Sequence, residues 1–364
     1  MSPEGPDPAD TAGRDPYGDL VHHWYAAARA ADLRDRPLAR TVLGHRLVLW
    51  RDRRGRAHAH RDRCLHRNAL LSRGAVIGDQ LGCPYHGWTY DADGRVACVP
   101  SLPPGEPLPQ DRLRAYPTRE DGGLVWVWVG PRAHDLPEHA TRRPFPMPHW
   151  GESGWGAYYM VTRFANGVTN LVENFMDVPH TVFVHRGWFR SATRRPTPIT
   201  VERTPASVLV TYTRPDDAIG WSDKLMNPKG LPLTHTDKFY APHHTRVDYL
   251  WGDPAAPERA FVITSTCTPI SPTETEVYTL ISYKLGTAMN ALARWWLPPY
   301  TRTVIGQDVV IMANQGESLR HGPAQFLGTS ADWLHEDIEA LRAWYHHPVG
   351  DPPTPRLRAT TILV

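Results

Sequence analysis

The chain has 364 residues, of which 41% are hydrophobic and 10% aromatic, so it can bury cores of ordinary size and is neither a peptide nor a disordered chain. Its 40 Lys and Arg residues nearly balance 38 Asp and Glu residues, and a net charge of +2 gives no field that argues for nucleic acid or an anionic membrane as partner. Four cysteines are too few for a disulfide scaffold, but beside 19 histidines they leave metal binding open.

Residues 1–18 are rich in proline and aspartate and contain no apolar run, which predicts a disordered tail and not a signal peptide. The longest apolar runs elsewhere, such as residues 124–129, fall short of the roughly 20 residues that a membrane-spanning helix needs. We therefore expect a cytoplasmic protein with no membrane partner.

The first half of the chain predicts a small, mostly antiparallel β domain over residues 19–145, introduced by a helix over residues 19–31. Asp93 and Gly94 separate two short β-rich runs, which is a hairpin signal. A proline-rich stretch, residues 131–148, discourages regular structure and predicts the domain boundary. The predicted strands cover residues 41–43, 47–50, 88–90, 96–97 and 124–129.

The second half, residues 146–364, predicts an α+β domain whose sheet wraps a long terminal helix. Helix is expected on both sides of Pro179 within residues 166–184. Residues 221–244 are rich in Pro, Gly and His and predict a lid loop, and pocket residues are expected on the strands 246–250 and 261–267. The predicted strands cover residues 207–212, 246–250, 260–267 and 276–284, and the predicted helices residues 288–296 and 302–319.

Two short segments of the first domain each carry one thiol and one imidazole: Cys64 with His66, and Cys83 with His86. A structural zinc site is the alternative for two Cys and two His, but zinc fingers usually take a Cys pair from one side and a His pair from the other. Mixed pairs suit a cluster in which two sulfurs bind one iron and two nitrogens bind the other. Residues 83–90, which read CPYHGWTY, resemble the second loop of a Rieske 2Fe-2S site.

The resemblance lacks two features of respiratory Rieske proteins. Tyr85 stands where a cysteine of their additional disulfide would lie, so that disulfide cannot form. Trp88 occupies the position of a serine that donates a hydrogen bond to a cluster sulfur in high-potential proteins. Fewer donors to sulfur lower the potential, so we expect a midpoint potential of about −150 mV. Cys98 and Cys267 are predicted to be ordinary thiols.

Polar ligand types concentrate among apolar residues in a second segment, residues 173–185. Two histidines and one carboxylate on one face of ferrous iron leave positions open for dioxygen. His180 and His185 are five residues apart and converge only if the turn between them is irregular or a helix ends there. The run Asn174, Asp177, His180 and His185 resembles the catalytic motif of Rieske non-haem iron oxygenases.

The resemblance implies that the third iron ligand is an aspartate on the C-terminal helix, and residues 307–315 are similar to that segment, which makes Asp308 the candidate. The residue before this aspartate is usually acidic in the family, whereas here it is Gln307. Glu317 and Glu173 are the alternatives for the third ligand.

Asp177 is similar to the bridging aspartate of the family, which implies hydrogen bonds to His180 and to the cluster ligand His86 of a neighbouring subunit. A carboxylate suits that role because it accepts from two imidazole N–H groups at once. The bridge implies a ring assembly, a homotrimer. Asn174 is similar to a residue near the iron.

The family resemblance covers nearly the whole chain after the tail and implies a catalytic domain of helix-grip, START-like type. It implies a monooxygenase of the demethylase branch that uses O2 and electrons from NAD(P)H, delivered by a flavin reductase or ferredoxin. The substrate would be a small aromatic, polycyclic or alkaloid-like compound that is hydroxylated or demethylated. An electron-transfer protein or redox sensor with a cluster but no mononuclear iron is the alternative, and a zinc-binding interaction module is a third reading.

Overall fold

The protein is described here by a computed structural model that covers residues 16–130, 142–188, 195–213 and 223–364. The chain separates into two compact units, Met1–Pro146 and Met147–Val364, each with its own sheets and cores. Most of the predicted tail, and residues 131–141 of the proline-rich stretch, lie outside the described residues.

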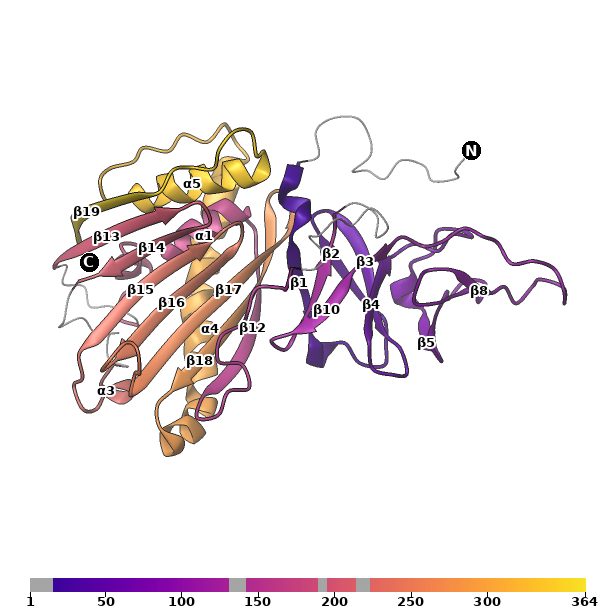
Figure 1. Cartoon of the computed structure of the whole chain (residues 1–364), viewed down its shortest axis with the longest axis horizontal. Coiled ribbons are helices and arrows are strands. Elements are labelled where there is room, and N and C mark those ends of the chain that lie inside the picture. Colours follow the sequence, from indigo (N-terminus) through magenta and orange to yellow (C-terminus); the bar gives the residue numbers. More distant parts are fainter. Residues whose placement is uncertain (1–15, 131–141, 189–194, 214–222) are drawn as a thin grey trace. The chain divides into compact units, whose positions relative to one another are not determined.

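Three antiparallel sheets build the first unit, with strand orders β1-β11-β10, β2-β3-β4-β9 and β5-β6-β7-β8 (Figure 1). All residues of β11 are buried, as its continuous apolar sequence LVWVW predicts for a central strand. The strands are β1 (Trp24–Arg29), β2 (Leu38–Val42), β3 (His45–Arg51), β4 (Ala57–Arg61), β5 (Ala75–Ile77), β6 (Gln80–Gly82), β7 (Thr89–Tyr90), β8 (Val96–Cys98), β9 (Ala115–Tyr116), β10 (Thr118–Asp121) and β11 (Leu124–Trp128).

The helix predicted over residues 19–31 is wrong. A single turn of 3-10 helix, η1 (Gly18–His22), leads into strand β1, and a second, η2 (Ala30–Asp32), follows it. Strand β1 pairs antiparallel with β11, and Trp24 lies opposite Trp128. The alanines of β1 favour helix locally, but pairing with β11 and burial of nearly the whole strand outweigh that preference.

The small sheet β5-β6-β7-β8 frames the segment with the predicted cluster ligands. The turn after Asp91 joins β7 to β8, and Gly94 adopts a positive φ of 78° there, as the hairpin signal predicts. The 3-10 helix η3 (Leu71–Arg73) precedes this sheet. The cysteines Cys64 and Cys83 lie in the core beneath it, together with Trp50 and Tyr90.

The second unit is built on one antiparallel sheet of eight strands in the order β12-β18-β17-β16-β15-β14-β13-β19. In Figure 1 the sheet curves around the long helix α4 (Thr287–Leu319). This α+β arrangement is the one predicted. The strands are β12 (Gly156–Phe164), β13 (Pro196–Thr204), β14 (Ser207–Tyr212), β15 (Leu233–Tyr240), β16 (His244–Trp251), β17 (Arg259–Ser271), β18 (Glu274–Lys284) and β19 (Arg356–Leu363).

Helix α4 joins the two helices that were predicted separately over residues 288–296 and 302–319. Pro298 and Pro299 lie inside it. Proline removes backbone donors but its φ is compatible with helix, and the buried side chains of Leu297 and Tyr300 hold both halves against the sheet. The other helices are α1 (Val168–Met176), α2 (Thr181–Val184), α3 (Asp223–Met226) and α5 (Trp333–His346).

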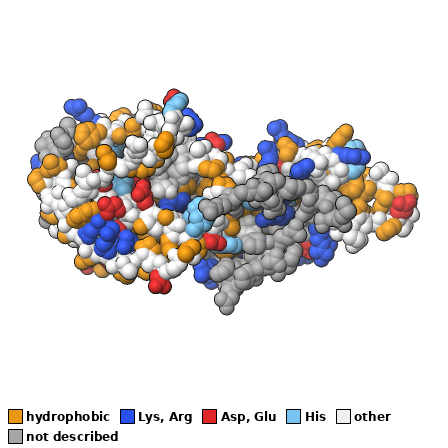
Figure 2. Space-filling view, turned by 90° about the horizontal axis from the view of Figure 1, so that it is seen from above, with side chains coloured by type: hydrophobic (Ala, Val, Ile, Leu, Met, Phe, Trp, Pro, Cys, Tyr) orange, Lys and Arg blue, Asp and Glu red, His pale blue; other side chains and the backbone are white. Residues whose placement is uncertain are grey.

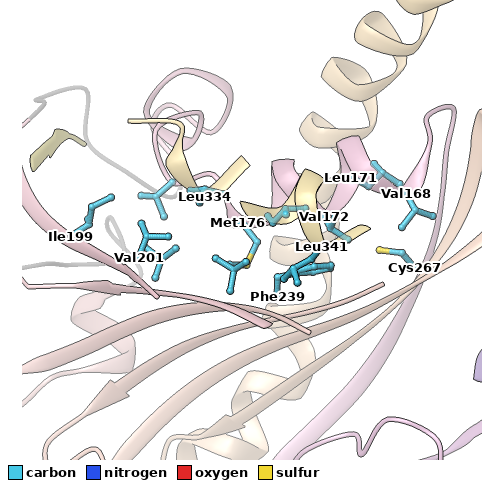
Figure 3. Close-up of a cluster of buried hydrophobic side chains, with 14 of the residues drawn as sticks. Val168, Leu171, Val172, Met176, Ile199, Val201, Phe239, Cys267, Leu334 and Leu341 are labelled. Carbon is cyan, nitrogen blue, oxygen red and sulfur yellow. The ribbon is translucent and has the colours of Figure 1, made fainter. Parts of the chain in front are cut away.

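A hydrophobic core holds α1 and α5 against the sheet (Figure 3). Leu171 and Val172 of α1 and Leu341 of α5 meet the fully buried Phe239 of β15. A second core joins the first half of α4 to strands β16, β17 and β18. The first core fixes α1 and the second half of α4, and the second core fixes the first half of α4, so together they set the positions of the residues that these helices carry.

The lid loop predicted over residues 221–244 is wrong for most of its length. Its described part contains α3 and the whole of β15, which pairs with β14 and β16 inside the sheet. Residues 221 and 222 lie outside the described residues. Strand β15 alternates buried and partly exposed residues, a period-two pattern that His235 and Asp237 share on the buried face.

On the face shown in Figure 2, Lys and Arg side chains are interspersed with Asp and Glu side chains among the described residues, as the near-neutral charge predicts. None of the described helices combines the length and the apolar character needed to cross a bilayer.

Candidate functional site

Two backbone turns of the first unit present the four predicted cluster ligands. The N–H of Cys64 donates to the carbonyl of Ala69, and the N–H of Cys83 donates to the carbonyl of Trp88. Gly87 adopts a φ of 70° inside the second turn, a conformation that favours glycine. Both turns therefore fold back on themselves and place the cysteine inside the core.

The two histidines lie side by side and nearer the surface than the cysteines. The ring centroids of His66 and His86 are 4.5 Å apart, and Trp88 stacks on His66 at 4.7 Å. The buried Nδ1 atom of His66 has no hydrogen-bond partner in the described part of the chain. Desolvation and the charge of His86 lower the pKa of His66, so its ring is neutral, the form that binds metal. These features fit a cluster held by two buried thiolates and two imidazoles.

Tyr90 supplies a donor that the sequence comparison with high-potential proteins did not identify. Its hydroxyl lies 3.0 Å from the Sγ atom of Cys64 and 3.1 Å from the backbone nitrogen of Leu65. Burial raises the pKa of the Tyr90 phenol above its usual range, so the phenol keeps its proton. The buried Nε1 atom of Trp88 has no hydrogen-bond partner among the described residues.

In the second unit, the chain turns sharply between two histidines. His180 precedes the single-turn helix α2 and His185 follows it, so the helix ends within the five-residue spacing, as convergence of the two rings requires. Helix α4 brings Asp308 to the same point. The two Nε2 atoms and a carboxylate oxygen of Asp308 all lie within 4.8 Å of one another.

The three groups face one another at distances that suit a shared metal ion. The Nε2 atoms of His180 and His185 are 3.3 Å apart, and Oδ1 of Asp308 lies 3.4 Å and 3.2 Å from them. Two imidazole nitrogens and one carboxylate oxygen that face one another are the donor set of ferrous iron sites. The residues therefore fit a mononuclear iron.

Burial and the neighbouring charged groups shift the pKa values of His180 and Asp308. Burial opposes the charged ring of His180, but Asp177 and Asp308 outweigh it and raise the pKa of His180 to about 9. Burial likewise opposes ionisation of Asp308, but hydrogen bonds from the two histidines lower its pKa to about 2. The carboxylate is thus ionised and suited to bind a cation.

Gln307 orients one of the histidines. Its Oε1 atom lies 2.8 Å from Nδ1 of His185, so the Nδ1–H group donates to the amide oxygen and Nε2 is the ring nitrogen that faces Asp308. The sequence marked Gln307 as a departure from the acidic residue usual in the family, and its contact with His185 was not predicted.

Asp177 and Asn174 also lie at this centre. Oδ2 of Asp177 accepts from the backbone N–H of His180 at 3.2 Å and lies 3.6 Å from Nδ1 of the same ring. Asn174 donates from Nδ2 to Oδ1 of Asp308 at 3.3 Å. The residues named as alternative ligands lie elsewhere: Glu173 contacts His335 at 3.6 Å, and Glu317 is exposed.

A cavity of about 120 Å³ adjoins these residues, between the sheet and helices α1, α2 and α4. Its walls are mostly apolar, and the sheet contributes residues from β16 and β17, where pocket residues were predicted. The lining includes Met160, Phe175, Val178, Asp237, Thr245, Val247, Tyr249, Phe261, Ile263, Ser265, Thr279, Ile281, Tyr300, Thr301, Val304 and Ile305 together with Asn174, Asp177, His180, Thr181, His185 and Asp308.

Two family models match the chain. Residues 23–117 match the Rieske [2Fe-2S] domain, and residues 167–340 match the vanillate O-demethylase oxygenase C-terminal domain. The first match contains all four predicted cluster ligands, and the second contains both histidines and the aspartate that converge in the second unit.

Curated relatives share part of the chain. It is 35% identical over 164 residues (44% of the chain, 45% of the relative) to the putative toluene-4-sulfonate monooxygenase system iron-sulfur subunit TsaM2 of Comamonas testosteroni. It is 40% identical over 173 residues (46% and 47%) to the oxygenase component of chloroacetanilide N-alkylformylase of Rhizorhabdus wittichii. These matches span less than half of the relatives' length.

Solved structures extend the likeness of fold to most of the chain. Dicamba monooxygenase bound to dicamba superposes with a TM-score of 0.75 at 20% identity, covering 90% of this chain and 98% of that one. Pseudomonas putida CBB5 NdmA with caffeine gives a TM-score of 0.74 at 21% identity, covering 91% and 93%. With a Rieske [2Fe-2S] domain followed by a vanillate O-demethylase-type oxygenase domain, the chain belongs to the Rieske non-haem iron oxygenases.

Proposed function

We propose that the protein is the oxygenase component of a Rieske monooxygenase system, which uses O2 and reducing electrons to hydroxylate or demethylate a small organic substrate. The observation that carries the proposal is the convergence of His180, His185 and Asp308 on the wall of a largely apolar cavity. A redox sensor or electron carrier has no need for a metal-binding triad that opens into a cavity for a small molecule.

The relatives give the proposal its chemical range. Their printed names include a monooxygenase, an O-demethylase, an N-alkylformylase and a hydroxylase, and the structural neighbours are titled with dicamba and caffeine. We propose the same range here: small aromatic or alkaloid-like compounds. A cavity of about 120 Å³ favours a compound with one ring, because a cavity of about 150 Å³ accepts benzene.

Cys64, His66, Cys83 and His86 would hold the 2Fe-2S cluster, and His180, His185 and Asp308 would hold Fe(II). When bound, these groups supply one-electron transfer and reductive activation of O2. Gln307 keeps the proton of His185 on Nδ1, so that Nε2 faces the iron site. The apolar side chains of the cavity exclude water and hold the substrate beside Asp308.

We place Asp177 between the two centres of neighbouring subunits. Its carboxylate already contacts His180 and is 22% exposed, so acceptor capacity remains for a histidine outside this unit. His86 is exposed on the first unit, as a ligand that meets another subunit must be. This arrangement needs a head-to-tail contact between copies of the chain, and we propose that it closes as a homotrimer, which sedimentation of the purified protein tests. We propose that the protein works in the cytoplasm, where NAD(P)H can supply electrons through a reductase.

Product formation with a surrogate reductase tests the function. Aryl methyl ethers and N-methylated heterocycles are incubated with the protein, NADH, reductase and O2, and products are identified by mass spectrometry. We expect formaldehyde or a hydroxylated product from at least one compound, with 18O from O2 in the hydroxylated product. Asp177→Asn should retain both metal sites yet form product at least about a hundredfold more slowly, because the link between the two centres is lost.

The control is His185→Ala, which should form no product. The proposal fails if the wild-type protein binds a cluster but no further iron, since that is the composition of an electron carrier. A colourless protein with bound zinc would indicate the zinc module instead.

A further inference from the structure

One carboxylate on the cavity wall is not explained by the metal site. Asp237 lies on β15, on the sheet side of the cavity, and is 1% exposed. The other two acidic residues of the described lining, Asp177 and Asp308, contact the histidines of the iron site. Asp237 contacts neither His180 nor His185, so the candidate iron site does not account for its carboxylate.

The neighbours of Asp237 hold its carboxylate in one orientation. Oδ1 lies 3.0 Å from Nε2 of His235, and Oδ2 accepts from the Tyr212 hydroxyl at 2.9 Å. The His235 ring lies between the rings of Tyr212 and Tyr249, with centroids 4.3 Å and 4.4 Å away. These three residues pair directly across β14, β15 and β16, so the sheet register itself positions the carboxylate.

The two contacts leave acceptor capacity on the carboxylate. An ionised carboxylate accepts about four hydrogen bonds, whereas Asp237 has two side-chain partners within the described part of the chain. Burying a charged group without full hydrogen bonding is costly. A donor group that enters the cavity would complete the set, so a ligand with such a group gains from this carboxylate.

Hydroxyl groups extend the polar strip along the wall. Thr245 pairs across the strands with Ser265, and Ser265 pairs with Thr279, whose hydroxyl lies 3.1 Å from that of Ser265. Thr245 is the diagonal neighbour of Asp237 in the register of β15 and β16. All three hydroxyl residues line the same cavity, so a polar strip runs across an otherwise apolar wall.

No counter-charge for an anionic ligand stands on this wall. The described residues that line the cavity include no lysine and no arginine. A carboxylate or sulfonate placed against Asp237 would meet a like charge in a site of low dielectric, and the repulsion would weaken its binding. The charge of the wall therefore excludes anions from its sheet side and favours cations or neutral donors.

We propose that the Asp237 carboxylate accepts a hydrogen bond from a protonated amine or an N–H group on a one-ring substrate. The enzyme would then bind basic nitrogen compounds in preference to aromatic acids. The substrate class rests on the function proposed above, but its recognition is measured by binding alone. Charge-assisted hydrogen bonds to a fixed carboxylate are among the stronger single contacts in proteins, and removing one changes affinity about tenfold or more.

Three ligands of matched shape test the proposal: benzylamine, which is a cation at pH 7, benzyl alcohol, which is neutral, and benzoate, which is an anion. Dissociation constants are measured by calorimetry on the metal-loaded protein without O2, for wild type and Asp237→Asn. We expect Asp237→Asn to weaken benzylamine binding at least tenfold, to change benzyl alcohol binding less than threefold and to leave benzoate binding unchanged or tighter. The ratio between variants cancels any contact of a ligand with the iron.

Asp248→Asn is the matched control, because this acid lies on the adjacent strand and pairs with Arg246 outside the cavity lining. It should leave all three constants unchanged. If Asp237→Asn alone does not fold, it is combined with Tyr212→Phe. The second change removes the Tyr212 hydroxyl, which would otherwise face the N–H group of the new amide. Tyr212→Phe alone is then the reference for the double variant. Equal factors for benzylamine and benzyl alcohol would overturn the proposal and would show that Asp237 only supports the sheet. Because no turnover is measured, a failure to form product leaves this result interpretable.

Discussion

The two candidate metal sites are built in opposite ways. The candidate cluster ligands come in two local pairs on turns of short β-strands, and His86 is exposed. The candidate iron ligands come from segments far apart in the chain, and His185 and Asp308 are buried at the contact of α2 with α4. The first design depends on local turns and meets the surface, whereas the second depends on the packing of the whole sheet and helix. Electron entry needs exposure, and oxygen chemistry needs shelter from water.

The largest expected effect is the loss of one metal group while the other stays bound. Cys83→Ser should abolish the cluster, because the cluster needs all four ligands, yet keep about one iron per chain in the second unit. His185→Ala should lose that iron and keep the cluster with its sulfide. Iron and acid-labile sulfide analysis with EPR measures both outcomes.

Cys98→Ser is the control for this pair, since Cys98 is exposed and has no assigned role. It should leave both metal contents unchanged. Loss of the mononuclear iron in Cys83→Ser would show that the two regions depend on one another for folding.

A smaller effect tests how the buried region orients its ligands. Gln307→Leu removes the acceptor for Nδ1 of His185, and loss of such a partner typically weakens metal affinity about 10–100-fold. We expect Fe(II) or Co(II) to bind at least about tenfold more weakly, with sulfide content unchanged. Gln307→Glu restores an acceptor and should bind the metal at least as tightly as wild type. Equal affinity of the Leu variant and the wild type would remove Gln307 from the site.

The smallest expected effect concerns the cluster. The hydroxyl of Tyr90 donates to Sγ of Cys64, and a bond to sulfur is stronger in the reduced, more negative cluster. Tyr90→Phe should lower the midpoint potential by about 40 mV, which corresponds to a hydrogen bond of about 1 kcal/mol. Tyr25→Phe removes a hydroxyl that donates to Leu20 outside this site and should leave the potential unchanged in redox titration. A potential that does not move in Tyr90→Phe would mean that this hydroxyl does not reach the cluster.

The most accurate predictions from the sequence concern features that depend on residues close together in the chain. The helices on both sides of Pro179 and most of the central strands follow from patterns of a few residues, and so does the grouping of Cys64, His66, Cys83 and His86 on two neighbouring turns. It predicted a helix over residues 19–31 because alanine favours helix, whereas pairing of β1 with β11 is a long-range contact that no local pattern reveals.

The contacts that position the ligands were the least predictable. Gln307, Tyr90 and Asp237 act through partners distant in the chain, and a single sequence carries no record of such contacts. Asp308 was predicted through the family motif, not from spacing. Residues 221–244 predict a lid loop because they are rich in Pro, Gly and His, yet β15 lies within them and its buried face contributes Asp237 to the cavity.

Helix α4 carries the iron-site aspartate and much of the facing cavity wall on one rigid element. Tyr300, Val304 and Asp308 follow one another at four-residue intervals, so each lies about 6 Å along the axis from the next. The helix therefore fixes the distances from the cavity-lining side chains of Tyr300 and Val304 to Asp308. Val304 lines the cavity about one helical turn from Asp308, so a larger or smaller side chain at residue 304 would change the space beside that carboxylate. In the oxygenase proposed above, this one position would then determine which atom of a substrate lies nearest the candidate metal site, with every candidate ligand unchanged.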